Sequence, residues 1–288
     1  MKKLTVSFFR IIESLFISII LLSCVTTRLD KELASTNIPY IIEENIQFPP
    51  EKNELTDYRY IFIRLYDPKY SNPLYIANLL KGGMSVTELS DDIVSHSSIN
   101  TNLTDNYYGL TMGGKFQLAK ESCTNVKNHK YMGKCDPKTS TQITFALKIK
   151  KDEALKIQES LELYSTDPHL TYDAFANFKI GIFEIGRKFF TPPKFRTLKK
   201  NYLPKVRKKD VKNFVCSTFI AYILINNVPE ISDWFKKHNF DYSYIGVSDL
   251  TQIPGMTKLF SSSWNNYNYA AFKFAQEYPE FKRYLNNY

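Results

Sequence analysis

The sequence predicts an α+β fold in which an antiparallel sheet packs on a buried helix. Residues 58–66 are a run of aromatic and β-branched side chains, which is typical of a strand. Residues 152–163 place apolar side chains at helical spacing and predict an amphipathic helix. The segment that begins at Cys216 is apolar on most sides and predicts a buried helix. Because strands and helices do not alternate regularly, a doubly wound sheet is not expected.

The other elements follow from local patterns of apolar and turn-forming residues. Two apolar stretches flank the polar turn at residues 102–106, and this arrangement predicts a hairpin. The other predicted strands cover residues 93–100, 107–112, 142–149, 244–247 and 259–263. The other predicted helices cover residues 73–80 and 268–278, with a partly helical segment at residues 175–190.

The N-terminal segment resembles the export signal of a bacterial lipoprotein. Lys2 and Lys3 make a basic start, and the apolar run at residues 14–22 is too short to span a membrane. The run ends Leu-Leu-Ser before Cys24, like a lipoprotein processing site. We expect a signal peptide at residues 1–23 and a lipid on Cys24, with an uncleaved anchor helix as the alternative. The protein would then be exported and lipid-anchored in the cell envelope, at the outer membrane, the cell surface or the periplasmic face.

Three segments follow this predicted signal peptide. Residues 24–54 are polar, contain Pro49-Pro50 and predict a tether behind the lipidated cysteine. Residues 55–265 are long enough for one domain with a substantial core. Residues 266–288 predict a C-terminal amphipathic helix and tail.

Positive charge is concentrated in one segment. The whole chain carries a formal charge of +9, and the residues from Lys188 to Lys212 include ten Lys or Arg and one acid. Such a segment predicts attraction to anionic lipid headgroups or to an anionic cell-wall polymer. A solvated loop is the alternative. Nucleic acid is not an expected partner, because the chain carries an export signal and no nucleic-acid motif.

The four cysteines divide by their surroundings. Cys123 and Cys135 lie in one polar loop, and in an exported protein a disulfide between them is favoured over free thiols. A metal site is less favoured, because these cysteines and His129 supply only three ligands at an unfamiliar spacing. Pairing of these two leaves Cys216 as a solitary thiol.

Cys216 and His96 have the residue types needed for acyl transfer by a thiol. A cysteine in the first turn of a buried helix lies near backbone N–H groups and the positive end of the helix dipole. Both effects lower the thiol pKa toward the nucleophilic thiolate. His96 lies in a strand-like run, and an imidazole brought beside the thiol would serve as general base.

The sequence around these two residues resembles the permuted branch of the papain-like fold. This branch includes the YiiX-like enzymes, relatives of the NlpC-type cell-wall peptidases, and the lecithin retinol acyltransferase group. The matching motifs are Ser95-His96-Ser97-Ser98-Ile99, Leu170-Thr171-Tyr172-Asp173, Phe214-Val215-Cys216-Ser217-Thr218-Phe219-Ile220-Ala221 and Val247-Ser248-Asp249-Leu250. The resemblance covers residues 58–262. It implies a circularly permuted papain-like fold, a Cys216 nucleophile, a His96 base and no metal or organic cofactor.

The family's third polar residue, which orients the imidazole, has no clear counterpart. Thr111, the Tyr108 hydroxyl, Asn100 or a backbone carbonyl could hold the ring. The resemblance implies a membrane-anchored amidase, peptidase, ester hydrolase or acyltransferase. A catalytically inactive binding or adhesion lipoprotein on the same fold is the alternative. The Cys216 N–H would be one oxyanion donor, and the sequence does not identify a second.

Overall fold

The computed structural model describes residues 40–42, 57–67, 96–110, 116–120, 140–173, 213–237 and 242–285. Its described strands form a seven-stranded antiparallel sheet in the order β1-β9-β6-β2-β3-β4-β5. Their bounds are β1 Tyr40–Ile42, β2 Tyr58–Asp67, β3 His96–Asn100, β4 Asn106–Gly109, β5 Gln117–Lys120, β6 Thr141–Lys150 and β9 Met256–Ser263. β7 (Thr171–Tyr172) and β8 (Asn213–Phe214) form a separate parallel pair. The α+β class is confirmed.

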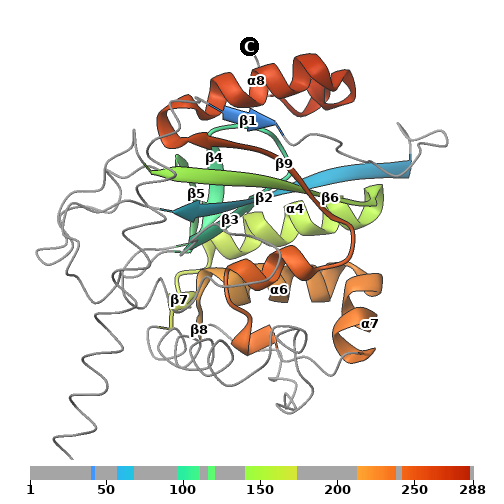
Figure 1. Cartoon of the computed structure of the whole chain (residues 1–288). Helices are drawn as coiled ribbons and strands as arrows, with labels where there is room; N and C mark the ends of the chain where they lie inside the picture. Colours follow the sequence, from blue (N-terminus) through green and yellow to red (C-terminus); the bar gives the residue numbers. More distant parts are fainter. Residues whose placement is uncertain are drawn as a thin grey trace, which may run out of the picture.

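The central strands are buried because helices cover both faces of the sheet (Figure 1). In β2, Ile61, Ile63 and Leu65 belong to one core, whereas Tyr60 and Phe62 belong to the other. This division follows from the alternation of side chains along a strand. The predicted hairpin is confirmed, since β3 pairs with β4 in antiparallel register.

The first face is covered by α4 (Lys151–Thr166) and α6 (Cys216–Asn227), and α7 (Pro229–Lys237) packs on α6. α4 buries Ala154, Ile157 and Leu161 against the sheet. Its start is capped, because the Glu153 carboxylate accepts a hydrogen bond of 3.0 Å from the Lys150 N–H. Nearly every side chain in the first three turns of α6 is buried.

The second face is covered by α8 (Tyr267–Glu277) and the 3₁₀ helix η5 (Pro279–Tyr284). This second core is rich in aromatic rings and surrounds one buried cation, Arg64. The guanidinium carbon of Arg64 lies 3.6 Å from the ring centroid of Tyr267 and 4.2 Å from that of Tyr107. Its Nε donates to Gln142 Oε1 at 3.1 Å, and Gln142 in turn donates to Ser262. The rings and the amide therefore replace the water that the charge would otherwise bind.

Two segments that were predicted to lie outside the domain pack against the sheet. Tyr40–Ile42, predicted within the tether, pairs with the edge of β9, because its aromatic and β-branched side chains suit a strand. α8, predicted outside the domain, buries Ala270, Ala271 and Phe274 in the second core. An amphipathic helix needs an apolar partner, and the sheet supplies it.

The predicted strand at residues 244–247 is wrong. The structure has the 3₁₀ helices η2 (Tyr242–Tyr244) and η3 (Ser248–Gln252) with a short connection between them. The N–H of Gly246 donates to Asp249 Oδ2 at 2.9 Å, and the carbonyl of Ile245 accepts from Ser217 Oγ at 2.7 Å. These backbone groups are engaged by side chains and are not available to a neighbouring strand. The predicted helices at residues 73–80 and 175–190 lie outside the described residues.

Candidate active site

Cys216 is the first residue of α6, and the turn that holds it is built from local hydrogen bonds. Val215 is extended and precedes the helix, and its N–H donates to Thr218 Oγ1 at 3.0 Å. The Thr218 hydroxyl lies 3.1 Å from the Val215 carbonyl, to which it donates. The helix start is therefore fixed on both sides of Cys216, whose side chain is buried. A thiol at this position lies near first-turn N–H groups that have no acceptor within the helix, and their partial positive charge favours the thiolate.

The segment at residues 245–252, after α7, also holds the turn at Cys216. Ser217 donates to the Ile245 carbonyl, as described above. The Asp249 carboxylate is fully buried and accepts from the Gly246 N–H and from Gln252 Nε2. A buried carboxylate held by several donors rigidifies its loop. This loop carries the Ser-Asp-Leu segment that the sequence singled out.

The structure brings His96 and Cys216 together. Burial by itself raises the pKa of the Cys216 thiol, but a hydrogen bond with the His96 side chain and the charge of His96 lower it. The nearby Ser97 hydroxyl and backbone N–H lower it further, so the net pKa lies below its ordinary value. His96 is the first residue of β3, so its ring lies at the end of the sheet, where it can reach the helix.

Tyr66 packs against the imidazole of His96. Its ring centroid lies 5.4 Å from that of His96 with the planes 31° apart. The Tyr66 hydroxyl and Ser98 Oγ are 2.8 Å apart, and Trp264 packs edge-on against Tyr66 at 5.1 Å. Tyr66 is fully buried, so this support is rigid. Sequence reasoning missed Tyr66, because its place beside His96 depends on the β2–β3 register.

Tyr172 approaches the thiol from a third element. β7 pairs with β8, with Tyr172 opposite Phe214, two residues before Cys216. Burial raises the pKa of Tyr172 well above its ordinary value, and the charges of Cys216 and Asp173 raise it further. Tyr172 therefore stays a neutral phenol beside the thiol, with an O–H that can donate.

The residues predicted to orient His96 are placed differently. The Asn100 amide donates to the Asn106 carbonyl at 2.7 Å and accepts from the Thr101 N–H at 2.7 Å, so it closes the β3–β4 turn. It lies four residues along the strand from His96, about 13 Å at a typical strand rise. The Tyr108 ring stacks on Phe116, and its hydroxyl hydrogen-bonds with Gln158 of α4. Thr111 lies outside the described residues.

Several other predicted features also lie outside the described residues. They are the signal peptide at residues 1–23, the lipidated Cys24, the Cys123–Cys135 disulfide and the basic segment from Lys188 to Lys212. Within the described ranges, no helix is both long and apolar enough to cross a membrane. The same ranges contain no group of three or more His, Cys, Asp or Glu side chains that could hold a metal ion.

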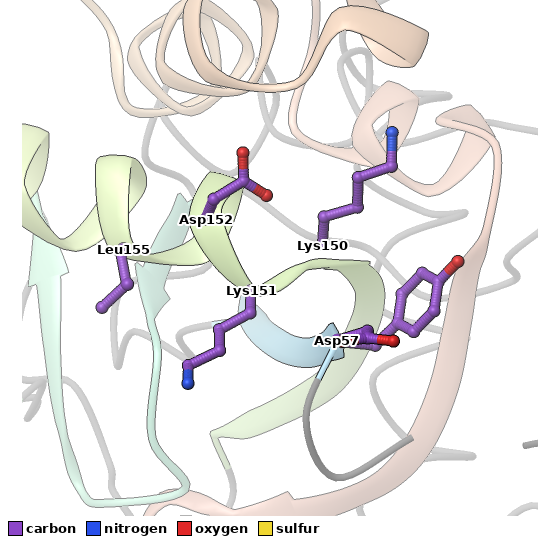
Figure 2. Close-up of a pocket in the computed structure, with 6 residues that line it drawn as sticks. Asp57, Lys150, Lys151, Asp152 and Leu155 are labelled. Carbon is purple, nitrogen blue, oxygen red and sulfur yellow. The ribbon is translucent and has the colours of Figure 1, made fainter. Parts of the chain in front are cut away.

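A pocket of about 450 Å³ opens at the start of α4 (Figure 2). It is lined by Asp57, Tyr58, Lys150, Lys151, Asp152 and Leu155. A neighbouring hollow shares Lys150 and Asp152 and reaches the C-terminal end of α6. Because α6 has 12 residues, this end lies about 18 Å from Cys216. Lys150 pairs with Glu230 at 3.6 Å on the exposed rim, so the pocket is a wet, charged surface feature.

Comparison with protein-family models, curated proteins and solved structures finds no match. Function is therefore inferred from the side chains around Cys216. These side chains are a nucleophile with a lowered pKa, a base in hydrogen-bond contact and a helix N-terminus beside both. This combination can attack an electrophilic carbonyl carbon.

Proposed function

We propose that the protein is a thiol hydrolase or acyltransferase on a permuted papain-like fold, with Cys216 as nucleophile and His96 as general base. The observation that carries this proposal is the hydrogen-bonded contact between His96 and a buried thiol whose pKa is lowered despite its burial. A buried cysteine with a purely structural role would have a raised pKa. The order along the chain, histidine strand before cysteine helix, supports the permuted fold.

The chemistry follows from the positions of these groups. His96 takes the thiol proton, and the sulfur lone pair forms a bond to the carbonyl carbon while the C=O π pair moves to oxygen. The Cys216 N–H at the start of α6 donates to this oxyanion. When the C=O bond re-forms, the amine or alcohol departs with the proton from His96 and leaves a thioester. Water or a second acceptor, deprotonated by His96, then releases the acyl group.

The test is hydrolysis of a panel of amide and ester substrates by the wild-type protein and the Cys216→Ala variant. We expect the variant to lose all turnover that the wild type shows. Asn226→Ala is the control, because it changes an exposed residue near the far end of the same helix and leaves the turn around the thiol in place. Equal turnover by wild type and Cys216→Ala would refute the assignment. A Cys216 thiol that resists alkylation would favour a non-catalytic binding lipoprotein.

We further propose that the protein is exported and held in the cell envelope by a lipid on Cys24. The support is the basic start, the short apolar run and the processing-site pattern described above. The ten cationic residues from Lys188 to Lys212 would add attraction to anionic lipid or cell-wall polymer. Incorporation of a labelled fatty acid by the wild type, but not by Cys24→Ala, is the expected result. Equal labelling of both would refute lipidation at Cys24.

A further inference from the structure

Ser97 carries a buried hydroxyl that makes no well-formed hydrogen bond. Its side chain is 1% exposed, and its Oγ has no hydrogen-bond partner among the described residues. In the sheet, Ser97 lies opposite Leu65 and shares the face of β3 that packs on α6. The adjacent Ser98 is equally buried on the opposite face and bonds with Tyr66. Neighbouring serines on one strand therefore differ in whether their hydroxyls are engaged.

The Ser97 hydroxyl lies beside the Cys216 thiol, where β3 packs on α6. Ser97 lies close enough to lower the pKa of that thiol through both its side chain and its backbone N–H. The hydroxyl makes no well-formed hydrogen bond with the resting thiol, because a thiol sulfur is a weak acceptor. A thiolate or an oxyanion at the same place would be a strong one. A buried donor without a partner destabilises a fold, and such groups are retained chiefly where function needs them.

We propose that Ser97 is a catalytic residue whose hydroxyl donates to the negative charge that forms at Cys216, first on sulfur and then on the substrate's carbonyl oxygen. This inference rests on the proposed thiol chemistry and supplies the second oxyanion donor that the sequence did not identify. As the sulfur lone pair enters the new C–S bond, charge moves from sulfur to oxygen. A hydroxyl can rotate to follow that movement, whereas the fixed N–H of Cys216 cannot.

Other ionisable groups near the thiol must be held constant in any test. The described titratable side chains around the first two turns of α6 come from β3, from β7 and the residue after it, from α4 and η2, and from α6 itself: His96, Tyr172, Asp173, Tyr164, Tyr242 and Tyr222. The Ser97→Ala change leaves all of them in place. Thr144→Val is the matched control, because Thr144 Oγ1 is also buried without a well-formed hydrogen bond but lies on β6, opposite Arg64 and beside Tyr267 on the other face.

The experiment measures alkylation of Cys216 by iodoacetamide against pH in the full chain, followed on the Cys216 peptide by mass spectrometry. For Ser97→Ala we expect a higher pH midpoint and about tenfold slower alkylation below the wild-type midpoint, as for loss of one hydrogen bond to a charged group. Thr144→Val should keep the wild-type profile. Ser97→Thr, which retains a hydroxyl, should recover most of the rate. On any ester or amide that the protein turns over, Ser97→Ala should lower kcat with little change in KM.

Thermal unfolding gives an independent readout. Since each variant removes a buried hydroxyl that makes no well-formed hydrogen bond, both Ser97→Ala and Thr144→Val should raise Tm, by roughly 2–4 °C. An unshifted alkylation profile, an equal shift in Thr144→Val or a lower Tm for Ser97→Ala would each overturn the role of Ser97. Turnover that depends on Cys216 together with an unshifted profile would refute this inference alone. A shifted profile without turnover of any substrate would refute only the proposed hydrolase function.

Discussion

The two faces of the sheet treat their buried polar groups in opposite ways. Toward α8, Arg64 is held between the rings of Tyr107 and Tyr267 and bonds with Gln142. Toward α6, the Ser97 hydroxyl is left without a partner beside Cys216. The first arrangement satisfies the guanidinium with rings and amide, and it stabilises the fold. The second arrangement leaves a buried hydroxyl donor without an acceptor, which lowers stability. Such donors are typical of sites where negative charge forms during a reaction.

Removal of Arg64 should give the largest change in stability. Arg64→Ala deletes a fully buried side chain, its contacts with the rings and its hydrogen bond to Gln142. We expect the free energy of unfolding to fall by about 3–5 kcal/mol, as measured by urea denaturation. Arg64→Met should recover part of this loss, because methionine refills the volume and packs well on aromatic rings. A loss below about 1 kcal/mol for Arg64→Ala would mean that the second core does not depend on this cation.

Removal of His96, at the end of β3 beside Cys216, should change reactivity more than stability. In His96→Ala the thiol loses the hydrogen bond and the charge of His96 while it stays buried, so the pKa of Cys216 should rise. The thiolate is the reactive form, so a higher pKa means slower alkylation at any pH below it. We expect at least a tenfold loss at about pH 6, equivalent to roughly 1.4 kcal/mol or more. His169→Ala, at an exposed histidine, is the control, and an unchanged profile for His96→Ala would break the proposed pair.

Loss of the Thr218 hydroxyl should have the smallest effect of the three. Thr218→Val leaves the Val215 N–H without its acceptor at the start of α6. We expect a loss of about 1 kcal/mol in unfolding free energy, as for other helix caps, by urea denaturation. Thr166→Val, at the exposed end of α4, should cost less than about 0.5 kcal/mol. Equal losses in the two variants would argue against a special role for the turn that holds Cys216.

Local patterns in the sequence were enough to predict much of the fold. The strand at residues 58–66 and the helix at residues 152–163 correspond to β2 and α4, because alternation and helical spacing are strong in both. The order of strands in the sheet could not be read from the sequence, since strand pairing depends on long-range packing. The wrong strand at residues 244–247 came from the apolar pattern, which does not reveal that Asp249 would engage the Gly246 backbone.

The candidate site was only partly accessible to the same reasoning. Cys216 and His96 stood out through their residue types and neighbours. Tyr66 and Ser97 carry no such signal, because a tyrosine and a serine in strands are common and usually structural. Their roles depend on the β2–β3 register, which places Tyr66 opposite His96 and Leu65 opposite Ser97. The lack of a partner for the Ser97 hydroxyl is a property of the folded structure and has no signal in the sequence.

The β7–β8 pair has a consequence for how such a protein can diverge. The chain leaves this pair at Asp173 and returns at Asn213, and the Asp173 N–H donates to the Phe214 carbonyl at 2.8 Å. The two ends of residues 174–212 are thus fastened together just before Cys216. The entropy of closing a segment grows only with the logarithm of its length, by about 0.6 kcal/mol for each doubling. Insertions and deletions in this stretch can therefore accumulate without displacing the thiol.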